Sequence, residues 1–245
     1  MNTIIVEGGK DMGNRIYPIG IQNFEKIRKE GYVYVDKTAL MYKLVKSGSY
    51  FFLSRPRRFG KSLLISTLEA YFEAKRDLFE GLAVETLEKD WVKRPVLHLD
   101  LNIGKYDTPD SLDKILNETL DYWESLYGTR SAETTLALRF AGVVGRAYEQ
   151  SGERVAILID EYDKPLLQAI GNEELQREFR NTLKPFYGVL KTMDGCIKFA
   201  LLTGVTKFGK VSVFSDLNNL NDISMDEPFI SICGITEKEI HLNFE

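Results

Sequence analysis

The chain has 245 residues, which is enough for one large α/β domain or two small domains. Apolar residues make up 44% of it and charged residues 28%, a balance typical of a globular protein with a sizeable core. The formal net charge of −4 disfavours a protein that binds nucleic acid through phosphate contacts, because such proteins normally carry a basic excess. The longest apolar run, residues 155–159, is far shorter than the roughly 20 residues of a membrane helix.

Cysteine usage and the N-terminal sequence bear on the cell compartment. The two cysteines, Cys196 and Cys233, lie far apart and outside any metal-binding spacing, which disfavours a disulfide scaffold and fits a reducing cytosol. Residues 1–15 contain no signal-peptide pattern. We therefore expect a soluble, cytoplasmic protein in which both thiols pack in apolar surroundings.

Helical and strand patterns alternate along the chain. Residues 1–16 are Gly-rich and polar and are expected to be flexible, and residues 18–34 form a segment with aromatic and aliphatic packing anchors. The patterns that follow predict a helix after an N-cap at Asp36, a strand at 50–53, a helix at 62–72, a strand at 96–101, helices at 111–126 and 134–148, a strand at 155–159, a helix at 173–190 and a strand at 197–202. Pro185 is expected to kink or split the helix at 173–190. This alternation predicts one domain built on a parallel sheet with helices on both faces.

The strongest motif lies between the predicted strand at 50–53 and the helix at 62–72. A strand, a loop and a helix that begins at Gly-Lys-Ser are the parts of a P-loop, whose backbone N–H groups surround phosphates. Gly60 would let the backbone approach closely, Lys61 would reach the β- and γ-phosphates, and the Ser62 hydroxyl would bind Mg²⁺. The predicted ATP-binding residues are Arg57, Arg58, Phe59, Gly60, Lys61, Ser62 and Leu63.

Arg55 stands where a standard P-loop has its first glycine, so the loop must begin along a different backbone path, which Pro56 stiffens. Among the three arginines of this segment, Arg58 is the best candidate for a phosphate contact, whereas solvated or salt-bridged surface roles fit Arg55 and Arg57 equally well. Gly-Lys-Ser by itself is equally compatible with an ordinary helix start that carries a surface lysine.

Two acids follow the apolar run at 155–159. Asp160 and Glu161 would emerge at the carboxyl end of a buried strand, where open α/β sheets bind their ligands. Asp160 is predicted to hold Mg²⁺ through water, and Glu161 is predicted to polarise the attacking water. The alternative is a pair of solvated acids that cap the next helix, which the order and context of the two motifs disfavour.

A third signal ends the strand predicted at 197–202. Thr203 and Gly204 follow it, and a hydroxyl at this place would donate to the γ-phosphate or to the nucleophilic water. A plain turn at a strand end explains the same residues, so the motif is weak by itself.

In combination, these residues resemble the AAA-ATPase-like family of bacterial and archaeal proteins, close to the archaeal-type ATPases of the P-loop class. The resemblance covers about residues 17–240. The residues that carry it lie at 34–38, 54–63, 159–163, 203–208, Ser215, 218–220 and 233–236. Arginine in place of the first glycine also resembles the pattern of this family.

The resemblance implies a three-layer α/β P-loop sandwich with a parallel sheet of about five strands and an incomplete C-terminal helical lid. We therefore expect a flexible segment at 1–16, an ATPase core at 17–235 and the start of the lid at 236–245. In this family a nuclease-like domain of the PD-(D/E)XK type often follows the lid. A downstream domain of this kind, or a partner protein, is therefore an expected partner.

Three functions remain open. The first is Mg²⁺-dependent hydrolysis of ATP to ADP and phosphate, with Lys61, Glu161 and Thr203 as the catalytic residues. The second is a nucleotide-dependent switch that hydrolyses ATP slowly or not at all and regulates a partner or a fused domain. The third is a nucleic-acid-associated ATPase, which the net charge disfavours.

Overall fold

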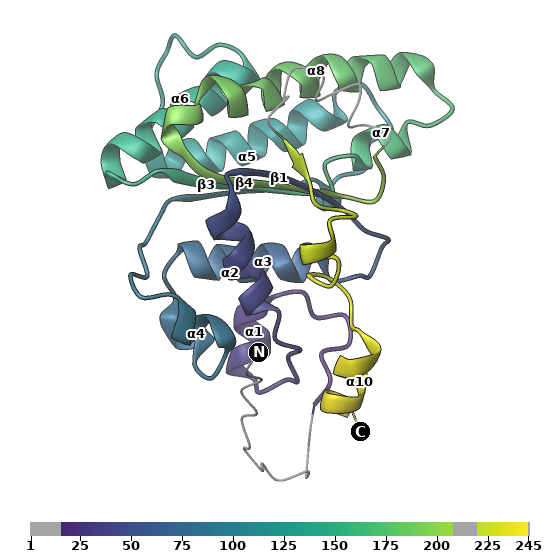
Figure 1. The fold of residues 1–245 in the computed structure, drawn as a ribbon. Coiled ribbons are helices and arrows are strands. Elements are labelled where there is room, and N and C mark those ends of the chain that lie inside the picture. Colours follow the sequence, from purple (N-terminus) through teal and green to yellow (C-terminus); the bar gives the residue numbers. More distant parts are fainter. Residues whose placement is uncertain (1–15, 208–219, 245) are drawn as a thin grey trace.

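The computed structural model describes residues 16–207 and 220–244. Within this part of the chain, parallel strands form one sheet in the order β2–β3–β4–β1–β5, as Figure 1 shows. The strands are β1 (Tyr50–Ser54), β2 (Val96–Asp100), β3 (Val155–Asp160), β4 (Ile197–Gly204) and β5 (Asn221–Asp222). The predicted three-layer α/β fold with a parallel sheet of about five strands is therefore confirmed.

Helices cover both faces of the sheet (Figure 1). One layer holds α5 (Ser111–Tyr127), α6 (Leu136–Ser151), α7 (Lys164–Gln168) and α8 (Glu173–Thr192). The other layer holds α1 (Phe24–Lys29), α2 (Thr38–Ser47), α3 (Lys61–Phe72) and α4 (Ala83–Leu87), with α10 (Glu237–Phe244) at its outer side. Short 3-10 helices lie at Arg76–Phe79, Leu101–Ile103, Asp194–Cys196 and Glu227–Phe229.

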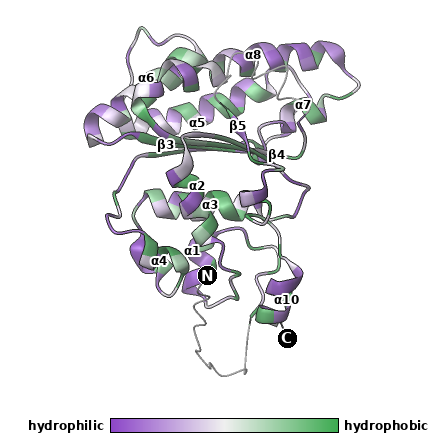
Figure 2. Ribbon diagram, viewed as in Figure 1, coloured by the Kyte–Doolittle hydropathy of each residue, from purple (hydrophilic) through white to green (hydrophobic). Residues whose placement is uncertain are grey.

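The strand β3 shows why the central strands are continuous apolar runs. All of its side chains are buried, and they alternate between the two helical layers. Val155, Ile157 and Ile159 pack in the cluster under α5, α6 and α8, whereas Ala156 and Leu158 pack in the cluster under α3. A strand covered on both faces needs apolar residues at every position. Figure 2 shows this hydrophobic sheet between helices whose outer sides are hydrophilic.

Three predicted details differ from the structure. The helix α8 continues through Pro185 and is not split there, because Pro185 and the neighbouring Asn181 lie on the exposed side, where water can satisfy the carbonyl that the proline leaves free. The N-cap of α2 is Lys37 and not Asp36, although the Asp36 carboxylate accepts hydrogen bonds from the Thr38 amide (2.8 Å) and hydroxyl (2.7 Å). Cys233 is buried as expected, whereas Cys196 is only partly buried, and both are free thiols.

Residues 1–15, 208–219 and 245 lie outside the described residues. They include most of the segment at 1–16 that is predicted to be flexible, and the motif residues Phe208, Ser215, Asn218 and Asn219. The division into a core at 17–235 and a lid that begins at 236 stays a prediction. No helix within 16–207 and 220–244 is long and apolar enough to cross a membrane.

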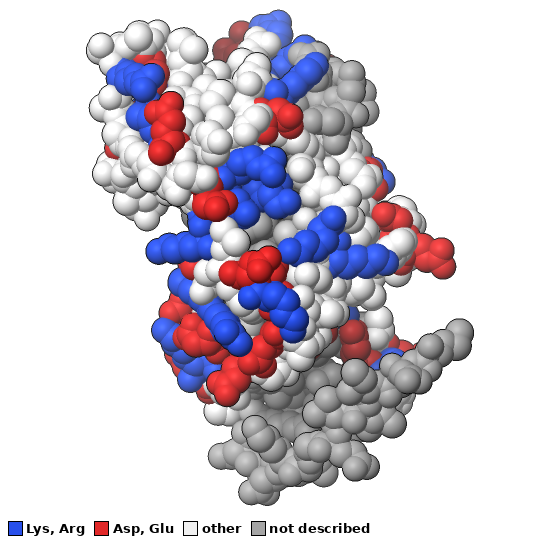
Figure 3. All heavy atoms as spheres, turned by 60° about the vertical axis from the view of Figure 1, so that its left-hand side comes forward, with Lys and Arg blue, Asp and Glu red and all other residues white. Residues whose placement is uncertain are grey.

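The edge of the sheet at which β2, β3 and β4 begin is lined by basic side chains. Arg94 precedes β2, Arg154 precedes β3, and Lys198 is the second residue of β4. Figure 3 brings this side of the molecule forward and shows Lys and Arg side chains gathered at mid-height. The strands run from this basic edge towards the opposite edge, where the predicted site residues lie.

Candidate functional site

The loop between β1 and α3 turns sharply just before the helix. Gly60 precedes α3 with φ of 83° and ψ of 19°, and Arg58 also has a positive φ, 68°. No atom lies within 4 Å of where a Cβ on Gly60 would stand, so the backbone conformation, and not crowding, favours glycine there. The loop therefore leaves open space in front of the first turn of α3.

The backbone N–H groups at this turn are unused. Among the described residues, no acceptor is found for the amides of residues 57–63, and the first amide that closes a helical hydrogen bond is that of Leu64, to the Gly60 carbonyl at 3.0 Å. The helix α3 is 12 residues long, so its N-terminus carries a partial positive charge in addition to these free donors. A helix start of this kind suits a phosphate group.

Lys61 begins α3 and is 4% exposed. Its ammonium donates to the carbonyl oxygens of Arg55 at 3.0 Å and Pro56 at 3.3 Å. It also forms an ion pair with the Glu161 carboxylate at 3.1 Å. The lysine thus spans from the loop to the end of β3, and the two predicted motifs meet through it.

Asp160 ends β3 and is 3% exposed. Its Oδ1 accepts a hydrogen bond from the hydroxyl of Thr203 on the neighbouring strand β4, and Thr203 is fully buried. The same Thr203 oxygen accepts a hydrogen bond from the Glu161 amide at 3.4 Å. The structure therefore brings Lys61, Asp160, Glu161 and Thr203 together, with the threonine hydroxyl engaged by its protein neighbours.

Glu161 holds an unusual backbone conformation. Its φ of 55° lies in the left-handed region, which a residue with a side chain adopts at an energetic cost. Its side chain is 14% exposed and is directed to Lys61 across the loop. Strain of this kind is common where a side chain must be aimed at a ligand.

Ser62, Arg57, Arg58, Phe59 and Leu63 complete the predicted set. Ser62 and Leu63 are half-buried in the first turn of α3, whereas Arg57, Arg58 and Phe59 are exposed on the loop. The exposed arginines can reach a ligand in front of the loop without breaking a contact recorded among the described residues.

Arg55, which stands where a standard P-loop has its first glycine, has a structural role. Its guanidinium donates to the carbonyl oxygens of Ser54 (3.0 Å), Ser224 and Ile230 (3.1 Å). It thereby ties the start of the loop to a segment far along the chain. A contact between residues so far apart in the chain cannot be predicted from the local sequence pattern, so the structural role of Arg55 was not expected.

Asp163, two residues beyond Glu161, is also structural. It is fully buried, and its two oxygens accept from the amides of Val205 (3.2 Å) and Thr206 (2.8 Å) and from the Thr206 hydroxyl (2.9 Å). Gly204 lies so close that a Cβ on it would come within 2.7 Å of Asp163 Oδ1 and 2.5 Å of the Tyr162 ring. The close approach of the two strand ends explains the glycine after Thr203.

One carboxylate near the site, that of Asp100, was not predicted from the sequence. It ends β2 and pairs in register with Asp160 on β3. Burial raises the pKa of Asp100, and the nearby Asp160 charge raises it further. The signal was present, because Asp100 lies at the end of a predicted strand, as Asp160 does. No group of three or more metal-ligating His, Cys, Asp or Glu side chains is assembled within 16–207 and 220–244.

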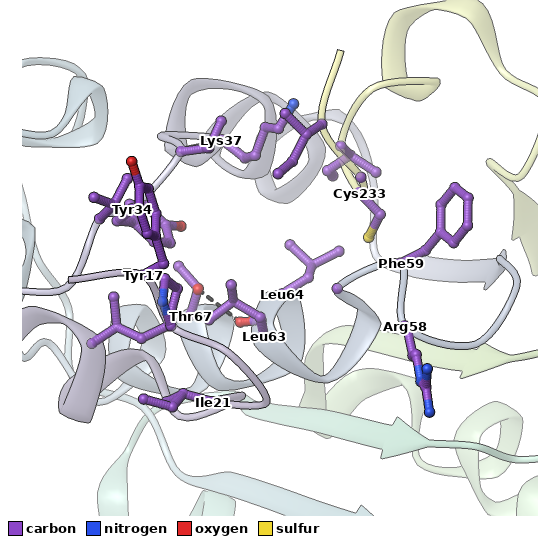
Figure 4. Close-up of a pocket in the computed structure, with 18 of the residues that line it drawn as sticks. Tyr17, Ile21, Tyr34, Lys37, Arg58, Phe59, Leu63, Leu64, Thr67 and Cys233 are labelled. Carbon is purple, nitrogen blue, oxygen red and sulfur yellow. Dashed lines mark hydrogen bonds between the residues drawn. The ribbon is translucent and has the colours of Figure 1, made fainter. Parts of the chain in front are cut away.

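A mostly apolar cavity of about 360 Å³ opens beside the loop. Its walls come from residues 17–35, from the turns of α3 up to Thr67, and from residues 232–235. Figure 4 shows Leu63, Leu64 and Thr67 along its floor and Tyr34 and Cys233 at opposite sides. Burial raises the pKa of the Cys233 thiol to about 11, so the thiol is neutral near pH 7. Arg58, Phe59 and Gly60 are also among the residues that line the cavity, so it borders the loop.

Comparison with known proteins agrees with this architecture. The chain is 42% identical over 235 residues to a curated protein of Azotobacter chroococcum mcd 1, described as an uncharacterized protein in the vnfD 5′ region. The match covers 95% of the chain but 45% of the relative, so the chain spans less than half of that relative's length. A family model described as predicted AAA-ATPase matches residues 18–214, which include the loop, Lys61, Asp160, Glu161 and Thr203. The chain therefore belongs to the predicted AAA-ATPase family.

Proposed function

We propose that this protein binds ATP together with Mg²⁺ and hydrolyses it to ADP and phosphate. The observation that carries the proposal is the meeting of two groups at one edge of the sheet. Free amides at residues 57–63 and the Lys61 ammonium supply positive charge, and Asp160 and Glu161 supply carboxylates beside them. Phosphoryl transfer needs this combination, since its catalysis is positioning and charge neutralisation.

The phosphates would lie in front of α3. The amides of residues 57–63 donate to phosphate oxygens, and Lys61 exchanges the carbonyls of Arg55 and Pro56 for the β- and γ-phosphates. Arg58 is exposed two residues before Gly60 and adds a charge-assisted contact. The donors therefore fit an acceptor-only ligand that carries several negative charges.

Ser62 and Asp160 are proposed to hold the Mg²⁺ that accompanies ATP, Ser62 directly and Asp160 through water. A hydroxyl at the start of a helix and a carboxylate at a strand end are oxygen donors of the kind that Mg²⁺ prefers. When bound there, Mg²⁺ would neutralise the negative charge that develops on the phosphate oxygens. The hydrogen bond from Thr203 orients the Asp160 carboxylate, and the assignment of Thr203 as a γ-phosphate sensor stays a prediction.

Glu161 is the proposed residue that polarises the attacking water. Its backbone strain and its contact with Lys61 place the carboxylate at the loop, close to where the lysine would hold the γ-phosphate. The nucleotide base would occupy the apolar cavity beside Leu64 and Tyr34, because a planar aromatic ring is suited to walls of this kind.

A second candidate, a nucleotide-dependent switch, is favoured by the same ion pair. While Lys61 neutralises Glu161, the carboxylate cannot act as a base, so hydrolysis requires a rearrangement that a partner or a fused domain could control. A nuclease-like domain is one such partner, and the curated relative is long enough to contain a further domain.

Steady-state hydrolysis and calorimetric ATP binding, each measured for the native chain and for Glu161→Gln, test the proposal. An ATPase loses turnover in the variant and keeps binding. A switch shows tight binding and negligible turnover in both proteins. The absence of ATP binding in the native chain with Mg²⁺ present contradicts both candidates.

A further inference from the structure

A second, smaller cavity lies at the opposite edge of the sheet, where the strands begin. Its volume is about 180 Å³, and Lys46, Arg94, Lys198 and Trp91 are among the residues that line it. Thr203 and Lys198 lie near opposite ends of β4 and are five residues apart, which corresponds to roughly 16 Å of strand. The cavity is therefore separate from the proposed ATP site.

Lys198 is the central residue of this cavity. Between β3 and β4, Val155 pairs with Ile197 and Ala156 pairs with Phe199, so Lys198 is the extra residue of a β-bulge. A bulge of this kind redirects one side chain out of the regular alternation of the strand. Among the described residues, the Lys198 ammonium has neither a hydrogen bond nor an ion pair, although the residue is only partly exposed.

The positive charge of Lys198 lies near other cations and is not compensated by an ion pair. Arg94 is paired with Glu153 at 2.5 Å, and Lys46 is paired with Glu88 at 3.0 Å. Arg154, which is exposed beside them, has no ion pair among the described residues. Burial lowers the pKa of Lys198, and the charges of Arg154, Arg94 and Lys46 lower it further. An anion in the cavity would remove this repulsion.

Two acids, Glu88 and Asp90, also line the cavity. Asp90 is exposed and forms no ion pair with Lys198 among the described residues, and Glu88 does not supply the missing negative charge either. Its carboxylate already accepts from the Tyr71 hydroxyl, from the amides of Lys89 (2.9 Å) and Asp90 (3.1 Å), and from Lys46. Burial would raise the pKa of Glu88, but these donors outweigh it and lower the pKa to about 2. Glu88 is thus ionised and fully engaged at neutral pH.

Trp91 gives an independent sign of a ligand. Its indole Nε1–H is buried and has no acceptor within residues 16–207 and 220–244, and a buried donor without a partner is costly. Its backbone φ of 40° lies in the left-handed region, which is rare for a bulky residue and is often found at binding sites. Trp91, the unpaired Lys198 and two further cations, Lys46 and Arg94, thus line one small space.

We propose that this cavity binds a phosphate group, either as free phosphate or as the phosphomonoester of a small molecule. The Lys198 ammonium and the Trp91 indole N–H are unpaired donors. Phosphate oxygens are acceptors that carry up to two charges at neutral pH. The cavity is too small for a folded segment, and the chain's net charge of −4 gives no support to a nucleic acid backbone as the ligand. The proposal does not depend on ATP hydrolysis at the other edge.

The two tryptophans provide a direct test, because only Trp91 lines the cavity and Trp123 is buried elsewhere in the core. In ¹H–¹⁵N spectra, inorganic phosphate is titrated into the nucleotide-free protein at constant ionic strength, with Trp91→Phe used to assign the indole signals. We expect a saturable downfield shift of the Trp91 indole and a much smaller shift of the Trp123 indole. Glycerol 3-phosphate, titrated in parallel, shows whether the site also accepts an esterified phosphate.

Charge variants decide whether the shift reports this site. Lys198→Gln should weaken the apparent phosphate affinity about tenfold, and Arg154→Gln should weaken it less, because one charge-assisted contact is lost in each. Lys191→Gln removes a charge from an exposed residue outside the cavity and should change nothing. Lys61→Ala should also leave the Trp91 shift unchanged, which separates this site from the ATP site. A shift that chloride reproduces, meaning an adventitious ion only, or an affinity unchanged by Lys198→Gln, overturns the proposal.

Discussion

The ammonium of Lys61 lies 3.1 Å from the Glu161 carboxylate, so the residue proposed to hold phosphates contacts the residue proposed to activate water. Lys61 is almost completely buried, and its other contacts are the loop carbonyls of Arg55 and Pro56. A bound γ-phosphate competes with all three for the same ammonium. Binding of ATP would therefore draw Lys61 from Glu161 and free the carboxylate at the moment when water must be polarised.

Replacement of Lys61 by Ala tests the phosphate contact. We expect ATP affinity to fall at least about tenfold, because a charged hydrogen bond of about 1.5–3 kcal/mol is lost, while the fold persists. Isothermal titration with MgATP measures the affinity, and circular dichroism checks the fold. Lys191→Ala, at an exposed position of α8, is the matched control. Unchanged ATP affinity in the Lys61 variant would rule out the assignment.

Replacement of Glu161 by Gln tests the proposed base. A general base contributes roughly 10²–10⁴-fold, so turnover should fall by that amount in the variant. Affinity for ATP should be kept or increased, because Gln no longer holds Lys61 in an ion pair. Phosphate release and calorimetry measure the two quantities. Equal turnover in the native and variant proteins would show that Glu161 is not the base.

Thr203→Val distinguishes two functions of the buried hydroxyl. If Thr203 orients Asp160, the loss of this hydrogen bond weakens Mg²⁺-dependent ATP binding by an amount worth about 1–3 kcal/mol and leaves binding in EDTA unchanged. Asp160→Ala should show the same dependence on Mg²⁺, more strongly. If Thr203 senses the γ-phosphate instead, Mg²⁺-dependent binding stays normal and turnover falls. Losses that are equal with and without Mg²⁺ contradict the role assigned to Asp160.

The parts of the fold that could be predicted are those in which burial dictates composition. β1 and β3 are apolar at nearly every position because helices cover both faces of the sheet, and this makes them visible in the sequence. β5 was not predicted because it has two residues, Asn221 and Asp222, and pairs only with β1 at the edge. Neither residue carries a hydrophobic signal.

The site residues also divide into those that could be predicted from the sequence and those that could not. Lys61, Asp160 and Glu161 could be placed at one edge because strand ends of a parallel sheet meet there. The contacts of Arg55 with Ile230 and of Asp163 with Thr206 join residues far apart in the chain, and no local pattern encodes them. Asp163 in particular could be mistaken for an alternative base from its position alone.

Asp163→Asn should reduce stability. Asn offers one acceptor where the carboxylate offers two, so either the Val205 or the Thr206 amide is left unsatisfied in a buried place. We expect a loss of about 1–3 kcal/mol in the free energy of unfolding, measured by urea denaturation. Asp107→Asn, at an exposed ion pair with Lys105, should change stability much less, because water screens that pair. Native stability combined with lost hydrolysis would instead make Asp163 a chemical participant.

Cys233 reports on the apolar cavity through the pH dependence of its alkylation. Burial raises the pKa of its thiol to about 11, so at neutral pH almost all of it is the unreactive thiol. As long as the pH stays well below the pKa, each increase of one pH unit raises the thiolate fraction tenfold. The rate of labelling by iodoacetamide should therefore rise about a hundredfold between pH 7 and pH 9. Mass spectrometry of the modified peptide measures the rate, in a Cys196→Ser background that leaves one thiol.

Protection of Cys233 by ATP tests where the nucleotide base binds. Cys233 lines the cavity proposed to hold the base, so saturating MgATP should slow its labelling at least about tenfold at every pH. In the native chain, Cys196 lies outside that cavity and should label at the same rate with and without ATP. Bound ATP that leaves the Cys233 rate unchanged would place the base elsewhere, even if the phosphates lie at Lys61. A rate that levels off well below pH 9 would show instead that the thiol is less buried than the structure has it.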